Sequence, residues 1–412
     1  MQALTVPGRR LTSYPDILSY SPPTNVVPHL SLDLDQEDIE SYVGETPVNY
    51  ADAQNRYENA GGRSQKPTKS IKSFSSAWAS KLDGQQEFER YQAYYGDGDY
   101  AHKWVNAALT GTATNFASGR GDADFAAGTV GSTDAARVQA IKKGTVFLSF
   151  WMWALYEFEA GLALCDPDST DENYAAVHKW DEGVAFYTGS LQTADDDTSG
   201  NLMYYLGQKR CPDFKTCGPN GDAATGQALS NKRLFDAATA GKDLMVAGNC
   251  DQVRPHMDII INAGSIPFIQ GALKYAYWSG TDDRSDKAKA EAAAFAAAVL
   301  PRVHSCSTTD AATIEAALKM DGTSTDFNTV KAAFERNYAC MNVTCADIGG
   351  RWKNDAYTWE ACTDPSSGLS TGALIAIIAG GVVAVLLVAV VAKKMLAKKP
   401  AAAASTSSKA AA

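Results

Sequence analysis

Residues 178–190, HKWDEGVAFYTGS, place one histidine and two carboxylates within about one turn of a predicted helix over residues 174–189. With a helical period of ~3.6 residues, His178, Asp181 and Glu182 fall within roughly 100° of arc. The adjoining arc is apolar, so these side chains are expected at the boundary of the core. Helix bundles build metal sites from inward-facing carboxylates and histidines, and a metal site is therefore one interpretation.

The other interpretation of this turn requires no ligand. Acidic side chains near the beginning of a helix interact favourably with its dipole, and His178 would then be a solvated surface residue. Spacing alone leaves both interpretations open.

The preceding segment, residues 146–165, is apolar on every face but contains Glu157 and Glu159. A carboxylate at the centre of a membrane helix costs about 2.5–3.5 kcal/mol to insert, so a buried helix of a soluble bundle is the better prediction. Buried carboxylates must be paired, hydrogen-bonded or bound to a metal ion. Glu157 and Glu159 are thus candidates for either metal ligation or a structural salt bridge.

Two further stretches contain groups that could bind an anion or a metal. MYYLGQKRC (203–211) brings Tyr204 and Arg210 close to a cysteine, and DQVRPHMD (251–258) places Arg254 at a helix start marked by Pro255. Aromatic packing is the usual role of such a tyrosine, and Arg254 could cap the helix instead of holding an anion.

The elements that must position these residues are mainly helical. Residues 46–345 contain long Ala-rich stretches separated by Gly/Asp/Ser/Thr loops, and strand-like alternation is scarce. Residues 1–45 are Pro-rich and acidic and are expected to be irregular, and residues 346–371 are expected to form a cysteine-containing stalk. The fold class is therefore mainly α, a helical-bundle ectodomain.

A weak internal repeat relates residues 147–165 to residues 263–280. It suggests two related helical lobes, at approximately 46–210 and 211–345. Glu157 and Glu159 align with Tyr275 and Tyr277 in the second lobe, so one principal metal site is expected, in the first lobe.

Residues 372–392 carry no charge and no proline over 21 positions, long enough for a transmembrane helix. Four lysines follow at once, which predicts a cytoplasmic tail over 393–412 and a type I, single-pass protein of the plasma membrane. The first twenty residues have no apolar core, so the signal peptide that this topology needs is missing and a truncated N-terminus is suspected.

Eight cysteines support an oxidised, extracellular ectodomain. Their close pairs, Cys211 with Cys217 and Cys340 with Cys345, are expected to form small disulfide loops. Asn342 lies in an NVT glycosylation sequon between the second pair.

Composition and motifs exclude several classes of function. The net charge of −10 and the pI near 5.1 argue against nucleic acid as a partner. Nucleotide-binding and hydrolase motifs are absent from the sequence, and we expect no enzyme.

The blocks YYGDGDYAHKWVNAAL, KWDEGVAFYTGSL, MYYLGQKRC and IPFIQGALKYAY resemble the algal low-iron-induced iron-assimilation proteins, whose membrane-anchored relatives are the phytotransferrins. The resemblance covers roughly residues 48–345. It implies capture of ferric iron at the cell surface with carbonate as a synergistic anion, followed by internalisation into endosomal vesicles. A surface ferric reductase or the endocytic machinery would be partners.

Fe(III) is a hard cation that favours anionic oxygen ligands and accepts imidazole. Helical geometry and block matching together give the candidate metal ligands Glu157, Glu159, His178, Asp181, Glu182, Tyr187 and Tyr204, with Arg210 and Arg254 as candidate anion partners. Two rival functions remain, a helical adhesion or receptor module without metal and a metal-dependent enzyme.

Overall fold

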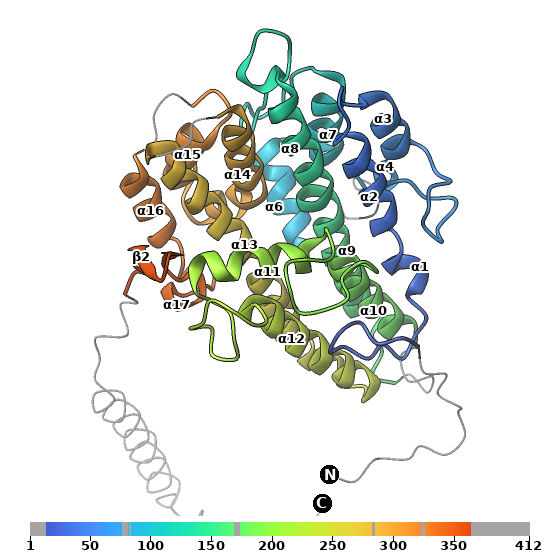
Figure 1. Ribbon diagram of the computed structural model, residues 1–412. Helices are drawn as coiled ribbons and strands as arrows, with labels where there is room; N and C mark the ends of the chain where they lie inside the picture. The colour runs from blue at the N-terminus through green and yellow to red at the C-terminus, as the bar shows by residue number, and fades with distance from the viewer. Residues whose placement is uncertain are drawn as a thin grey trace, which may run out of the picture. The chain divides into compact units, whose positions relative to one another are not determined.

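The Ala-rich helix α14 (Asp286–Cys306) runs through the core of the computed structural model, packed against α13 (Arg254–Thr281) (Figure 1). Its residues from Ala288 to Val303 are buried on nearly every side, as expected of a helix that is apolar all round. The structure describes residues 14–75, 81, 84–168, 174–281, 285–322 and 326–363. The mainly helical fold class is confirmed.

Around this pair the remaining helices form an irregular bundle. Helix α14 also contacts α6, α8 and α15, whereas α13 contacts α11, α12 and α16. The other elements are α1 Val27–Leu30, α2 Asp33–Tyr42, α3 Tyr50–Glu58, α4 Ile71–Ser75, α6 Gln86–Tyr95, α7 Tyr100–Thr110, η1 Val130–Ser132, α8 Asp134–Gly144, η2 Thr145–Phe150, α9 Trp151–Leu164, α10 Tyr174–Thr188, α11 Met203–Phe214, α12 Leu229–Val246, η3 Cys250–Gln252, α15 Thr308–Leu318, α16 Phe327–Glu335, α17 Cys345–Ile348, β1 Arg351–Lys353 and β2 Ala356–Trp359.

Helices α9 and α10 carry the acidic residues singled out above, and they pack closely against each other. Two glycines permit this approach. A Cβ atom on Gly161 would lie 2.9 Å from the carbonyl oxygen of Ala176, and one on Gly183 would lie 2.8 Å from the ring of Phe158. The side chains at this interface are therefore held at a fixed and short separation.

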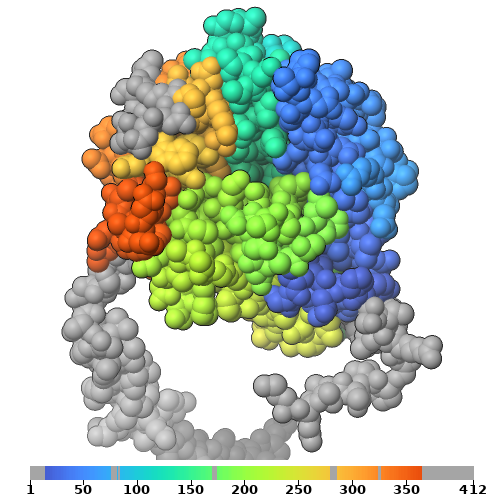
Figure 2. Space-filling view, viewed as in Figure 1, coloured from blue at the N-terminus to red at the C-terminus, as the bar shows by residue number. Residues whose placement is uncertain are grey.

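The N-terminal segment differs from the prediction of an irregular lead-in over residues 1–45. Its described part forms α1 and α2, and α1 packs against α10. Asp33 accepts hydrogen bonds from the Ser190 hydroxyl and the Leu191 backbone N–H, which ties this segment to the end of α10. In Figure 2 these dark blue residues lie directly beside the green part of the surface. The proline content and acidic composition of this segment did not predict α1 and α2, which tertiary contacts hold in place.

The predicted stalk also differs from the structure over its described part. Residues 345–362 form α17 and an antiparallel hairpin of β1 and β2, with Lys353 paired to Ala356. Asn354 and Asp355 both have positive φ, as a two-residue hairpin turn requires. Arg351 is buried and donates to the carboxylate of Asp213 on α11, so the hairpin belongs to the bundle.

Four disulfides join the eight cysteines, as an oxidised ectodomain predicts. The Cys211–Cys217 loop is confirmed, whereas the predicted Cys340–Cys345 loop is wrong. Cys340 pairs with Cys306 at the end of α14, and Cys345 pairs with Cys362 beyond the hairpin. Spacing in sequence could not show that these elements are neighbours in space. The fourth bridge joins Cys165 to Cys250.

The predicted transmembrane helix, residues 372–392, lies outside the described residues. Within the described part of the chain, no helix combines the length and the apolarity that crossing a bilayer requires. Residues up to Cys362 pack as one unit. The division into two related lobes stays a prediction.

Replacing Gly161 with alanine should destabilise the protein, because the new methyl group meets backbone of α10 that cannot rotate away. We expect a net loss of about 1–3 kcal/mol, measured as a lower midpoint of thermal unfolding. The control is Ala163→Ser, at an exposed position of the same helix, which should change little. Equal midpoints for Gly161→Ala and the parent protein would contradict the close packing of α9 on α10.

Candidate functional site

Two buried carboxylates meet where α9 packs against α10. Glu157 is 3% exposed and Glu182 is 4% exposed. One lysine bridges them, because Lys179 Nζ lies 2.8 Å from Glu157 Oε2 and 2.6 Å from Glu182 Oε2. Glu157 also accepts a hydrogen bond of 2.8 Å from the Trp153 indole N–H. Two acidic groups thus share a single cation.

The second oxygen of Glu182 faces two histidines from different elements. His29 of α1 and His178 of α10 place their Nε2 atoms 2.9 Å and 3.0 Å from Glu182 Oε1. The two rings lie edge to face, with centroids 6.0 Å apart. Glu157, Glu182, Lys179, His29 and His178 are called the carboxylate–histidine cluster below.

Asp181 lies next to the cluster and supports it through the N-terminal segment. It is completely buried and accepts hydrogen bonds from the Tyr20 hydroxyl at 2.5 Å and the Thr24 hydroxyl at 2.6 Å. The same Thr24 oxygen lies 3.0 Å from His178 Nδ1. Asp181 therefore orients His178 through Thr24.

This chain of hydrogen bonds determines which nitrogen of His178 carries the proton. A threonine hydroxyl has one hydrogen, and Thr24 gives it to Asp181. The contact with His178 then requires Nδ1 to be the donor. In a neutral ring, Nε2 consequently carries a lone pair that faces the Glu182 carboxylate. That contact is favourable only if a proton or another cation lies between the two atoms.

Burial and charge separate the pKa values of the two glutamates. Burial, followed by repulsion from Glu182, raises the pKa of Glu157, although Lys179 opposes the rise. Burial acts in the same direction on Glu182, but hydrogen bonds with His178, His29 and Lys179 outweigh it and hold its pKa well below the usual range. Glu182 is the permanent anion, and Glu157 is the carboxylate that can take up a proton.

Neighbouring groups are shifted as well. Burial raises the pKa of Asp181 to about 6, against the effect of its hydrogen bonds from Thr24 and Tyr20. Burial lowers the pKa of His29, so its ring is held in the neutral form that can act as a ligand. Lys66 lies near enough for both cluster glutamates to influence its pKa, which burial lowers overall.

The remaining residues predicted as ligands lie apart from the cluster. Glu159 forms a bidentate pair with Arg254, with both N–O distances 2.6 Å, so each satisfies the other. The Tyr187 hydroxyl donates to Asn231, and the Tyr204 hydroxyl donates to Asp195. The prediction gathered residues by helical face, but these side chains are engaged elsewhere.

Arg210, the second predicted anion partner, lies on α11. Its Nη1 atom is 3.3 Å from Asp213 Oδ2, and its side chain is 5% exposed. It makes no hydrogen bond to a residue of the cluster among the described residues.

Among the residues that the structure describes, no group of three or more His, Cys, Asp and Glu side chains forms a ready-made metal site. The cluster includes Lys179, whose ammonium lies between the two carboxylates. Nevertheless, the His29 and His178 Nε2 atoms lie 2.9 and 3.0 Å from Glu182 Oε1, and these separations suit neighbouring ligands of an octahedral metal ion. Neighbouring ligand atoms are about 3 Å apart when metal–ligand bonds are about 2.1 Å long. The donor set fits a hard cation if Lys179 moves away.

Sequence reasoning missed His29, Lys179, Thr24 and Tyr20. Three of them belong to the segment that was expected to be irregular, about 150 residues away from α10. The chain has only five histidines, and His29 in VPHL is the one nearest the N-terminus. Its rarity was the only available signal. Lys179 was overlooked because a lysine on a helix is usually solvated.

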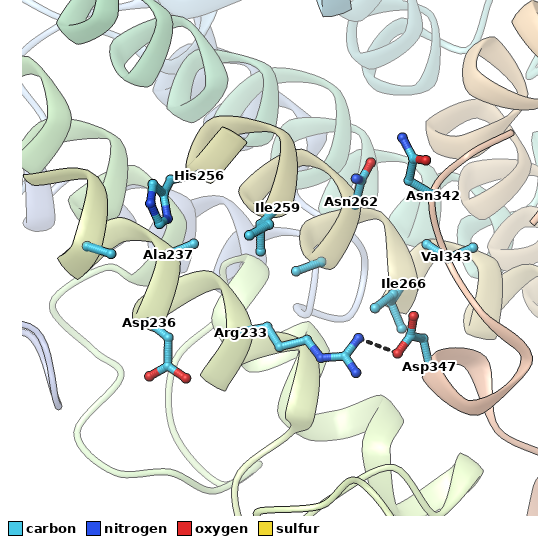
Figure 3. A pocket seen from close by; sticks show the side chains of 12 residues that line it. Arg233, Asp236, Ala237, His256, Ile259, Asn262, Ile266, Asn342, Val343 and Asp347 are labelled. Carbon is cyan, nitrogen blue, oxygen red and sulfur yellow. Dashed lines mark hydrogen bonds and ion pairs between the residues drawn. The ribbon is translucent and has the colours of Figure 1, made fainter. Parts of the chain in front are cut away.

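A separate hollow of about 570 Å³ lies between α12 and α13 and contains none of the predicted site residues. Figure 3 shows His256 and Ile259 of α13 on one side of it and the Arg233–Asp347 ion pair at its end. Asn342, the sequon residue, is at its edge and exposed. This hollow is mostly apolar and does not offer a carboxylate set like that of α9 and α10.

Comparison with known proteins supports the sequence resemblance. The model of one family, Fea1, described as low iron-inducible periplasmic protein, matches residues 3–367. No curated protein sequence and no solved structure matches the chain. The family match includes α1, α9 and α10, and hence every residue of the cluster. Because it spans most of the sequence, the chain belongs to the family of low iron-inducible periplasmic proteins.

Proposed function

We propose that this protein captures ferric iron at the cell surface for uptake, and that the carboxylate–histidine cluster is the binding site. The observation that carries the proposal is the pair of imidazole Nε2 atoms directed at one oxygen of the buried Glu182. His178 has its lone pair on that side when it is neutral. A multiply charged cation in this position would satisfy the His178 lone pair and the carboxylates together.

Lys179 acts in the iron-free protein as a substitute cation. Its side chain is 30% exposed, so it can leave the two carboxylates and enter solvent without disturbing the helix. When iron binds, the three positive charges of Fe(III) replace the single charge of Lys179 between the two buried carboxylates. The metal would be held by Glu157, Glu182, His29 and His178.

Carbonate as a second ligand belongs to the same proposal. Lys179, once displaced, and Lys66 would supply positive charge at the edge of the cluster. Arg254 is less suited, because Glu159 already occupies its guanidinium group. A C-terminal membrane anchor would hold the protein at the surface, and endocytosis would carry it to an acidified vesicle where iron is released. A surface reductase is the alternative partner for release.

The variants Glu157→Gln and Glu182→Gln, which remove a charge, should each weaken ferric iron binding by more than about 100-fold. Mutating a residue that only hydrogen-bonds to a metal ligand already lowers metal affinity by about 10–100-fold. Iron content of the purified full chain, after loading with a weak ferric chelate, measures the effect. The matched control is Glu159→Gln, on the same helix but paired with Arg254, which should retain iron.

Loading with and without bicarbonate, on the same samples, tests the anion. Retention that rises with bicarbonate in the parent protein supports carbonate as a ligand. Normal iron binding by both Glu157→Gln and Glu182→Gln would contradict the site, and it would favour an adhesion module in which the cluster is a structural ion-pair network.

Iron retention should fall as the pH falls from 7.5 to 5, because protons compete with iron for the Glu157 carboxylate. The pKa of Glu157 is raised in the iron-free protein, mainly by burial, so protonation begins well above the usual carboxyl range near 4.3. Loss of iron is therefore expected to begin at a higher pH than an ordinary carboxylate ligand would allow. Retention that is unchanged down to pH 5 would contradict the proposal.

Replacing Lys179 with methionine should destabilise the iron-free protein, since two buried carboxylates lose their shared partner. Removing one partner of a fully buried pair costs about 3–5 kcal/mol, and the partial exposure of Lys179 reduces the expected loss to about 2 kcal/mol. Ferric iron should then raise the unfolding midpoint more in this variant than in the parent protein.

The matched control for this variant is Lys232→Met, which removes an exposed ion pair with Asp236. Its response to iron should equal that of the parent. An equal or smaller iron-induced shift in Lys179→Met would show that the lysine does not occupy the metal position.

A further inference from the structure

A second cavity, of about 450 Å³, opens between α8, η2, α11, α13 and α14. It shares no lining residue with the carboxylate–histidine cluster. Six cationic side chains line it, against two carboxylates: Lys142, Lys143, Lys209, Arg210, Lys274 and Lys287, with Glu40 and Glu291. We call it the basic cavity. Such an excess of positive charge stands out in a chain whose net charge is −10.

The carboxylates of the cavity do not neutralise its cations. Lys142 pairs with Glu40 at 2.7 Å, and Lys143 pairs with Glu291 at 2.8 Å. In the described part of the chain, Lys209 and Lys287 form no ion pair. Both are exposed at the rim, where they would meet an incoming anion first.

Three cations, two of which line the cavity, share one carboxylate. Asp213 lies 3.3 Å from Arg210 Nη1, 2.6 Å from Lys274 Nζ and 2.9 Å from Arg351 Nη1. Its pKa is lowered because these charges outweigh the effect of burial. Positive charge at the base of the cavity therefore remains in excess.

Arg210 provides the most direct indication of a ligand. Its side chain is 95% buried, since 5% is exposed, and its Nε and Nη1 atoms have no hydrogen-bond partner among the described residues. Buried donors without acceptors are rare in native proteins and cost free energy. Burial and then the charge of Arg210 lower the pKa of nearby Lys274 to about 8, although Asp213 opposes this effect.

The walls of the basic cavity indicate what else the ligand contains. Phe147, Leu206, Tyr275 and Trp278 line it beside the cations, so a bound anion would contact apolar surface as well as charge. The volume falls within the range of small-molecule sites, about 300–1,000 Å³, and exceeds the needs of a simple inorganic oxyanion. An organic body with more than one anionic group satisfies both features.

We propose that the basic cavity binds a small organic polycarboxylate, with Arg210 and Lys274 holding one carboxylate at its base and Lys209 and Lys287 attracting the others at its rim. The site is distinct from the iron site, and its occupancy does not depend on iron. A planar guanidinium group presents its donors in a fixed geometry that suits one carboxylate in a bidentate contact.

The test uses the iron-free full chain and tricarballylate, a tricarboxylate that chelates iron weakly, followed by isothermal titration calorimetry. We expect saturable binding that Arg210→Gln and Lys274→Gln each weaken at least tenfold. The rim variant Lys209→Gln/Lys287→Gln should fold normally and weaken binding several-fold, with a smaller dependence on salt.

The matched control, Lys103→Gln/Lys232→Gln, removes the same charge at partly exposed sites outside the cavity and should bind like the parent. Glu182→Gln should also bind tricarballylate normally, which separates this site from the iron site. No binding by the parent protein, or equal loss in the control and rim variants, would overturn the proposal. Inorganic phosphate that binds as tightly as tricarballylate would overturn the organic character of the ligand.

Discussion

Two carboxylates buried between α9 and α10 are the constraint on which the N-terminal half of this fold depends. Charged glutamates in a dry interface are tolerable only if cations and donors surround them. Lys179 lies across both, and His29 and His178 close the remaining side of Glu182. Without these partners, the close approach of the two helices would be unfavourable.

The same constraint explains why the N-terminal segment folds onto α10. His29 completes the surroundings of Glu182, while Tyr20 and Thr24 provide the hydroxyl groups that satisfy Asp181. The segment has little helical character of its own, and its order follows from these polar contacts and from the burial of residues such as Val26 and Leu32. The proposed iron site and a folding contact are thus built from the same side chains.

Sequence reasoning reached the helices and several residues of the carboxylate–histidine cluster. The helix expected over 174–189 extends from Tyr174 to Thr188. Glu157 and Glu182 are buried because each lies beside apolar residues on its own helix. Glu159 lies two residues beyond Glu157, a rotation of about 200° along the helix, and it therefore pairs with Arg254 outside the cluster. Periodicity describes one helix at a time, whereas the cluster joins three elements.

The same limit applied to the disulfides and to the basic cavity. Cys340 and Cys345 are close in sequence but lie beside different elements, and only packing reveals their partners. Arg210 was singled out as an anion partner, yet its neighbours Lys143, Lys274 and Lys287 come from three other helices. Long-range neighbours of this kind leave no trace in spacing.

The Cys345–Cys362 bridge has a mechanical consequence for the end of the bundle. A pull applied to the chain beyond Cys362 reaches α17 through the covalent bond between the two sulfur atoms, so the load bypasses β1 and β2. The short hairpin, with few hydrogen bonds of its own, is shielded from being peeled open. Force from any tether at this end would instead enter the bundle at Cys345, the first residue of α17.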